Sequence, residues 1–405
     1  MAESEIRVYS YRWIVLVVFM FILGMTQLLW ITFAPITKNA AQFYGVSDLK
    51  IGLFSMSFMI VYIFVSIPAS WVIDTYGFRV GVGVGAVLTG VFALTRGIFA
   101  SDYNLVLLSQ VGIAVGQPFV LNSITKVAAR WFPINERATA AGLGSLALYL
   151  GIVAGMALTP YLTIKYGLPE MLYIYGVVSL ISAFTFILLA REKPPTPPCP
   201  PGQEERALML DGLNQMIRQK DFIILMVVFF IGLGIFNGVT TWIEDIIRPR
   251  GFTVVQAGNL GGLMVIGGII GAVVMPLLSD FYRKRKPFIL LAVIGAIPGL
   301  LGITFATSYW LLLLSGFVFG FFILSAGPIG FQFGAELTYP APEGTSNGLL
   351  ILMGQISGII FIFAMDRFKS PATGSMTPSM LILIGLMVLG LVLFPVLRES
   401  TLIKE

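Results

Sequence analysis

Uncharged polar and aromatic side chains interrupt several long apolar runs of this chain. The clearest cases are Gln27, Trp30, Gln117 and Gln355. An indole face attracts an organic cation through its quadrupole, which is worth about 2 kcal/mol when the pair is desolvated. A primary amide can hold a hydroxyl group or a water molecule without adding charge. These residue types therefore suit the binding of a small molecule better than they suit a reaction.

Side chains that usually carry catalysis or metal binding are scarce. The chain has no histidine, and its single cysteine, Cys199, lies in a proline-rich stretch. A serine–histidine pair, a histidine metal site and an intrachain disulfide are therefore excluded, and no phosphate-cradling loop is present. We expect no enzyme activity, no cofactor and no bound metal.

The segments that must position these side chains are long and apolar. Hydrophobic residues make up 57% of the chain and charged residues only 11%. A helix needs about 20 apolar residues to cross the hydrocarbon layer, because backbone groups in lipid must bond internally. We therefore predict an all-α membrane protein with twelve spans, at about 13–37, 51–73, 79–99, 103–129, 137–164, 169–190, 221–247, 255–279, 286–306, 309–334, 344–366 and 377–397.

The two halves of the chain repeat each other at a distance of about 206 positions. Asp74 pairs with Asp280, Gly52 with Gly258, and Gly142 with Gly348. Two halves related in this way must share one fold. We predict two pseudo-symmetric six-helix bundles, at residues 1–190 and 221–405, joined by a linker at 191–220 that is rich in proline.

Basic residues indicate the orientation of the spans. Seventeen lysines and arginines fall on the side of the N-terminus and eight on the opposite side. This bias predicts that both termini and the linker are cytoplasmic in a multi-pass protein of the cell (inner) membrane. The net charge of +5 lies in short loops and not on one face, so we do not expect a nucleic-acid partner. The expected partners are the lipid bilayer and a small-molecule substrate, and the expected state is a monomer.

A charged loop follows the second predicted span. The run from Asp74 to Arg79 resembles the loop signature of the major facilitator superfamily, although Ser70 and Thr75 depart from it. In that family such a carboxylate caps a helix and pairs with a loop arginine when the cytoplasmic side is closed. We expect a gating role, with a topology-setting charge cluster as the alternative, for Asp74, Arg79, Arg130, Glu136, Arg137, Asp280, Glu336 and Glu343.

Further motifs narrow the resemblance. The segments 43–46, 68–75, 330–340 and 343–346 are similar to those of the feline leukaemia virus subgroup C receptor family. That family comprises facilitators assigned to choline and ethanolamine, and earlier to haem. The similarity covers most of the chain, which is shorter at both ends, as a prokaryotic relative would be. It implies transport by alternating access between the two bundles.

The resemblance also implies a substrate site. Trp30 matches a tryptophan that packs against the ammonium group, and Gln117 and Gln355 match two cavity glutamines. Gln27 lies one turn before Trp30, and packing between helices is the alternative role for all of these side chains. Where the family has a second aromatic ring in span 7, this chain has Asn237. The expected site is Gln27, Trp30, Gln117, Asn122, Tyr149, Phe236, Asn237 and Gln355.

Charged residues avoid the centres of the predicted spans. Arg96, Lys126, Glu336 and Asp366 sit near span ends, where their side chains can snorkel to water. Proton coupling normally needs a buried titratable group, so we expect facilitated uniport. Glu244 and Asp245 are expected either to attract a cation at the outer side of the protein or, equally, to be solvated residues at the start of a loop.

Our leading hypothesis is a facilitator for a small organic cation such as choline or ethanolamine. A carrier of a neutral or anionic metabolite is the first alternative, because Asn237 removes a ring and Arg96 could attract anions. A haem or porphyrin exporter is another, and the lack of histidine counts against iron ligation. A receptor or scaffold without transport would have a dry interior, which the polar residues within the spans oppose.

Overall fold

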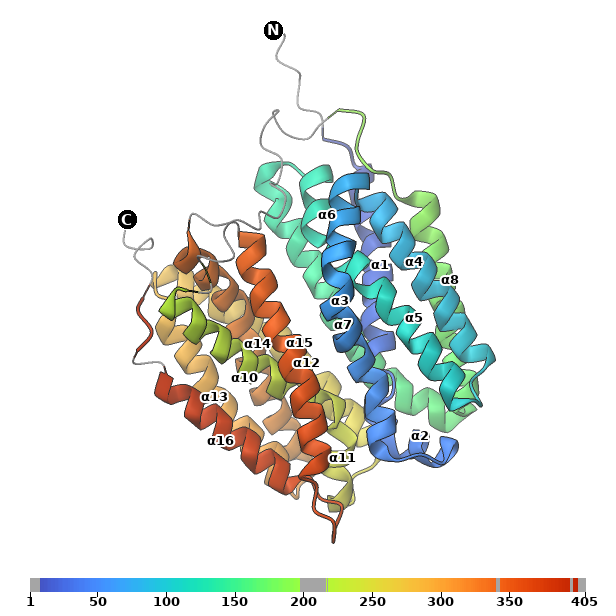
Figure 1. Ribbon diagram of the computed structural model, residues 1–405, viewed down its shortest axis with the longest axis vertical. Helices are drawn as coiled ribbons and strands as arrows, with labels where there is room; N and C mark the ends of the chain where they lie inside the picture. The colour runs from blue at the N-terminus through green and yellow to red at the C-terminus, as the bar shows by residue number, and fades with distance from the viewer. Residues whose placement is uncertain (1–7, 197–215, 217, 340–342, 394–395, 400–405) are drawn as a thin grey trace.

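A computed structural model describes residues 8–196, 216, 218–339, 343–393 and 396–399 (Figure 1). Within this part of the chain, eleven helices are long and apolar enough to cross a membrane. A twelfth apolar helix, α16 (Thr377–Leu393), is shorter. The predicted all-α class is confirmed. Most of the expected linker, 197–215 and 217, lies outside the described residues.

The first half of the chain forms one bundle. Helix α4 packs between α5 and α8, and α1 packs against α7. A glycine in the left-handed region, Gly77 with φ of 91°, makes the tight turn between α3 and α4. The helices are α1 (Tyr11–Ile31), α2 (Thr37–Tyr44), α3 (Asp48–Tyr76), α4 (Phe78–Ile98), α5 (Tyr103–Leu121), α6 (Ile124–Trp131), α7 (Ile134–Tyr166) and α8 (Leu168–Leu189), with a short 3-10 turn η1 (Ala34–Ile36).

The second half repeats this arrangement. Helix α14 packs against α12 and α13, and α10 packs against α15. Thr253 and Gln256 form a capping box that begins α12, because each side chain satisfies a backbone N–H of the other. The helices are α10 (Lys220–Thr241), α11 (Ile243–Ile247), α12 (Val254–Phe281), α13 (Lys286–Phe305), α14 (Tyr309–Thr338), α15 (Glu343–Arg367) and α16, with a 3-10 turn η3 (Arg248–Arg250).

Three of the expected spans are interrupted. The first ends at Ile31 and resumes in α2, the fourth is broken at residues 122–123, and the seventh is broken at Trp242. Pro118 precedes the second break, where it removes a helical hydrogen bond. Discontinuous helices are common around the substrate sites of transporters. Trp30 therefore lies next to the break in the first candidate span, Tyr11–Tyr44, and near the middle of that span.

The two bundles approach each other at one end only. Figure 1 shows α3 and α15 converging towards the end that carries α2 and α11, and diverging towards the end that carries α6. We call the first the junction end and the second the splayed end. The repeat glycines Gly52 and Gly258 allow the close approach: a Cβ atom at Gly258 would clash with the carbonyl oxygen of Met156 in the other bundle.

Candidate functional site

Aromatic rings from both bundles gather near the junction end. Trp30 in α1 and Phe236 in α10 are each nearly buried, with 7% and 6% exposed, and belong to one apolar cluster with residues of both halves. They are 206 positions apart, so they occupy equivalent places in the repeat. Tyr149 in α7 packs against the same cluster. All three thus belong to the large apolar cluster that joins the two bundles.

The three expected glutamines come from α1, α5 and α15. Gln27 makes only a long contact of 3.5 Å from its Nε2 to Thr26 Oγ1. The amides of Gln117 and Gln355 have no hydrogen-bond partner among the described residues, although Gln117 is only 7% exposed. Neither amide is among the buried polar atoms that lack a partner, so both remain accessible to water or to a ligand. No hydrogen bond joins any two of these three glutamines within the described part of the chain.

Asn237 lies where α10, α15 and α3 meet. Its Nδ2 donates to the backbone carbonyl of Gly354 over 3.2 Å, one residue before Gln355. A Cβ atom at Gly358 would lie 2.9 Å from that Nδ2 and 2.6 Å from Sδ of Met59 in the other bundle. Asn237 therefore ties α10 to α15 at the contact between the bundles.

Asn122 makes hydrogen bonds with side chains of α3. Its Oδ1 accepts a hydrogen bond from Tyr62 over 3.0 Å, and its Nδ2 donates to the hydroxyl oxygens of Ser66 and Ser70 over 3.1 and 3.0 Å. These partners all belong to α3. The amide is therefore occupied in holding the broken fourth span against α3, and we leave Asn122 out of the proposed substrate site.

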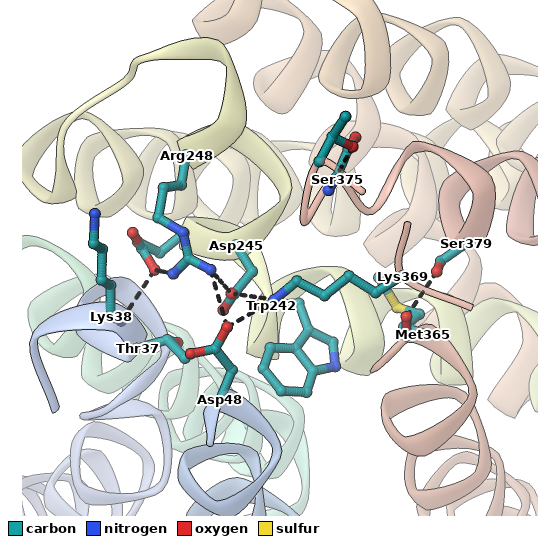
Figure 2. A network of polar contacts seen from close by, with 12 residues as sticks. Thr37, Lys38, Asp48, Trp242, Asp245, Arg248, Met365, Lys369, Ser375 and Ser379 are labelled. Carbon is teal, nitrogen blue, oxygen red and sulfur yellow. Dashed lines mark hydrogen bonds and ion pairs between the residues drawn. The ribbon is translucent and has the colours of Figure 1, made fainter. Parts of the chain in front are cut away.

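A network of charges closes the junction end (Figure 2). Asp48 begins α3 of the first bundle, and its Oδ2 accepts from Arg248 Nη2 over 3.0 Å and from Lys369 Nζ over 2.7 Å. The same two nitrogens donate to Asp245 Oδ1 over 2.6 and 3.2 Å. Two cations of the second bundle are thus shared by one carboxylate from each bundle. We call Asp48, Asp245, Arg248 and Lys369 the junction network.

Glu244 extends this network to α2. Its Oε2 accepts from Arg248 Nη1 over 2.9 Å and from the backbone N–H of Lys38 over 3.2 Å. The expectation of an exposed acidic lure is wrong, because Glu244 and Asp245 are 2% and 0% exposed. A shallow pocket of about 380 Å³ opens beside the network, lined by Lys38, Ala41, Gln42, Gly45, Val46, Asp48 and Arg248.

The electrostatics follow from burial. Loss of water raises the pKa of Asp245 to about 7, and the cations Arg248 and Lys369 offset this only in part. Burial also raises the pKa of Glu244. Burial alone would lower the pKa of Lys369, but the attraction of Asp245 and Asp48 outweighs it and the pKa is raised. The network is therefore held together by charge against a large desolvation cost.

At the splayed end, ion pairs join residues of the same bundle. Asp74 accepts from Lys126 over 2.9 Å, and Glu136 Oε1 accepts from Arg12 Nη2 over 3.3 Å. In the second bundle, Arg285 bonds Asp280 and Glu336. The hydrogen bonds and ion pairs of Lys38, Asp48, Glu244, Arg248 and Lys369 join the two bundles at the junction end.

The remaining expected gating residues are placed as follows. Arg79 is not the partner of Asp74: its backbone N–H donates to Glu192 Oε2 over 2.8 Å, so that Glu192 caps α4. Arg137 donates to the carbonyl of Phe132 over 3.3 Å, and Arg130 lies half-buried near the end of α6. Glu343 begins α15, and its side chain lies outside the described residues.

The expectation that the Arg96 side chain reaches water at the end of its span is wrong. It is completely buried in the first bundle, where its Nη1 donates to Gln110 Oε1 over 2.6 Å and to the carbonyl of Leu29 over 3.3 Å. Sequence reasoning also missed the roles of Asp48, Arg248 and Lys369. Each sits at a predicted loop, where a charge is ordinarily solvated, so their types and positions carried little signal.

Comparisons with known proteins agree with this architecture. Solute carrier family 49 member A3 of Xenopus tropicalis is 30% identical over 93% of this chain and 82% of its own. The human choline/ethanolamine transporter FLVCR2 is 28% identical over 90% of this chain and 73% of its own. These relatives bear out the resemblance drawn from the motifs.

Solved structures share the fold. A bacterial homologue of the human lysosomal transporter Spinster, in an inward-facing and unoccupied conformation, superposes with a TM-score of 0.76 at 15% identity over 96% of this chain and 98% of its own. The nucleoside transporter NupG gives a TM-score of 0.72 at 14% identity over 95% and 99%. The family model of the Major Facilitator Superfamily matches residues 12–362. With eleven long apolar helices and a shorter twelfth among its described residues, this chain belongs to the major facilitator superfamily and is a membrane transporter, not an enzyme.

Proposed function

We propose that this transporter is a facilitator for a small organic cation such as choline or ethanolamine. The observation that carries the proposal is the pair Trp30 and Phe236, one ring from each bundle at equivalent repeat positions in a shared apolar cluster. Two rings can hold an ammonium group through their negative faces. The relatives named as choline/ethanolamine transporters support the same substrate class.

The neighbouring amides suit the rest of such a substrate. Gln27, Gln117 and Gln355 can accept or donate to a hydroxyl group without adding charge. We assign the substrate site to Gln27, Trp30, Gln117, Tyr149, Phe236, Asn237 and Gln355. No described residue of these adds a charge to the site, so cation binding rests on the rings and on the exclusion of water.

We further propose that the junction end faces outside and that both termini are cytoplasmic. The bias of basic residues supports this orientation. Under it, the structure is closed to the outside by the junction network and splayed towards the cytoplasm. Opening requires Asp48 to leave Arg248 and Lys369, while Asp74, Glu136, Asp280 and Glu336, with Arg12, Lys126 and Arg285, exchange their partners at the splayed end.

Uptake into proteoliposomes tests the substrate class. Purified protein should take up labelled choline or ethanolamine down its gradient. Trp30→Ala should raise the substrate concentration that gives half-maximal uptake by up to about thirtyfold. This corresponds to the loss of an interaction worth about 2 kcal/mol. Trp30→Phe should keep part of the affinity. Trp310→Ala is the matched control, because Trp310 is 79% exposed at the start of α14. Unchanged uptake in Trp30→Ala would refute the site.

A carrier of a neutral or anionic metabolite is the second candidate. The observation that favours it is Asn237, an amide at the position where the family resemblance implies a second ring. Screening cations against carboxylates by ligand-induced thermal stabilisation separates the two candidates. Stabilisation by carboxylates alone would favour the second.

A further inference from the structure

Helix α1 ends inside the protein, immediately after Trp30. Residues 28 to 33 are all buried. The last carbonyl groups of a helix have no partner within it, and buried ones must find donors elsewhere. The structure supplies these donors from side chains: Thr32 Oγ1 donates to Leu28 O over 2.9 Å and Ser55 Oγ donates to Trp30 O over 3.4 Å.

The carbonyl of Leu29, between these two, receives two donors. Arg96 Nη1 lies 3.3 Å from it and Gln110 Nε2 lies 3.2 Å from it. Gln110 also accepts from Arg96 over 2.6 Å and donates to the carbonyl of Phe54 over 3.4 Å. The pair therefore links α4 and α5 to the end of α1 and to the second turn of α3.

Arg96 has no carboxylate partner among the described residues. Its Nε and Nη2 are buried without a hydrogen bond there. The negative end of the α1 dipole and the ring of Phe33, whose centroid lies 5.7 Å from the guanidinium carbon, face this charge. A buried charge without a counter-ion is costly, so the stability of Arg96 in this place depends on the carbonyl, amide and ring that it contacts.

The second bundle lacks this arrangement. Positions 206 later than Ser55, Arg96 and Gln110 are Gly261, Gly302 and Gly316. There the chain continues almost as a helix, because Trp242 N donates to Gly238 O and Ile246 N donates to Trp242 O. The break after α10 is thus bridged by backbone bonds, whereas the break after α1 is held by side chains.

We propose that Arg96 and Gln110, with Ser55, are positioning residues that fix the end of α1 and thereby the ring of Trp30. This inference rests on the proposed cation site for its link to affinity. These residues do not touch the substrate. They hold the Leu29 and Trp30 carbonyls in place, so that the indole of Trp30 is already oriented when the substrate arrives.

A double-mutant cycle tests the link. Arg96→Met should weaken choline binding to the purified protein by up to about thirtyfold, the whole effect of the ring. In a Trp30→Ala background the same change should have almost no further effect on choline affinity, because Arg96 acts on the substrate only through the ring of Trp30. Arg96→Lys should restore part of the affinity. Equal losses in both backgrounds would overturn the proposal.

Arg250→Met is the matched control. Arg250 donates to the carbonyls of Ala306 and Ile303 at the end of α13, so it caps a helix end in the other bundle. It should lower thermal stability without changing choline affinity. If Arg96→Met does not fold, Gln110→Leu, which removes the second donor to Leu29 O, takes its place in the cycle.

Amide hydrogen exchange separates this inference from the proposed function. In protein without ligand, Arg96→Met should speed exchange in residues 28–36 and leave residues 234–242 unchanged. This holds whichever substrate is carried, so a lack of choline binding by the wild type would refute the function alone. Unchanged exchange in 28–36 would refute the positioning role.

Discussion

The junction end and the splayed end carry similar residues in different partnerships. At the junction end, Asp48 shares Arg248 and Lys369 with Asp245, and these contacts join the bundles. At the splayed end, Asp74 bonds Lys126 and Asp280 bonds Arg285, each within its bundle. The glycines differ in the same way. A Cβ atom would clash with the other bundle at Gly258 but meets nothing within 4 Å at Gly142 or Gly348.

This difference indicates how the same fold can close either at the junction end or at the splayed end. Repeat-related glycines lie on both ends, yet only one end can be packed at a time if the bundles move as rigid bodies. We infer that Gly142 and Gly348 become the close-contact positions when the splayed end closes. The charges at that end are then available to exchange partners between bundles.

Replacing the glycines should give the largest effect. Gly258→Leu places a side chain against the carbonyl of Met156, and backbone cannot move aside. We expect uptake to fall by more than about tenfold, with the junction end held open. Gly348→Leu should also abolish uptake but hold the splayed end open.

The measurement is labelling of a cysteine at position 117 in a Cys199→Ser background. An impermeant maleimide added outside should label Gly258→Leu faster than the parent and Gly348→Leu more slowly. Gly83→Leu in α4 is the control and should behave as the parent, because a Cβ atom there meets nothing within 4 Å and α4 packs inside the first bundle. The same labelling rate in Gly258→Leu and Gly348→Leu would contradict the comparison.

Breaking the junction network should have the next largest effect. Asp48→Asn leaves Arg248 and Lys369 with less than their full counter-charge. Removing one partner of a buried pair costs about 3–5 kcal/mol, and partial exposure of Asp48 reduces this. We expect the open fraction at the junction end to rise by about tenfold or more. Outside labelling of the cysteine at position 117 measures it, and no change would rule out a gating role for Asp48.

External pH should shift the same equilibrium. The raised pKa of Asp245, about 7, means that the closed junction binds its proton more tightly than an open, hydrated junction does. The contribution of Asp245 to closure is therefore progressively lost as the pH rises to about 7. Asp48 opposes this contribution at low pH, because its pKa is lowered in the closed junction.

Between pH 5 and 7, each unit should favour opening by up to about tenfold. Labelling from outside across this range measures it, with Asp245→Asn as the control that should flatten the profile. A profile unchanged in Asp245→Asn would show that another group titrates.

Asp74→Asn should have the smallest effect. Asp74 is partly exposed and pairs with one lysine of its own bundle, and such pairs are worth about 1 kcal/mol or less. We expect little change in outside labelling or in melting temperature. An effect as large as that of Asp48→Asn would show that the two ends are not different in the state described.

Much of the fold could be predicted from the sequence. The apolar runs matched the helices within a few residues, except where three spans break. The break after Ile31 was missed because its stabilising donors, Arg96 and Gln110, are more than 60 residues away. The rings of Trp30 and Phe236 were identified as candidates, but not their common cluster. The burial of Asp245 was missed because a charge at a loop is ordinarily solvated.

The sequence by itself determined the number of spans, their repeat and their membrane setting. Lipid offers no hydrogen bonds, so about 20 consecutive apolar residues can only form a helix. It could not determine which charges meet. Asp48 and Lys369 are 321 positions apart, and their contact exists only because the bundles close at one end. Tertiary structure decided these pairings. A charge in a loop can pair with any opposite charge, and the packing of the bundles determines which one lies nearby and whether water is excluded from the pair.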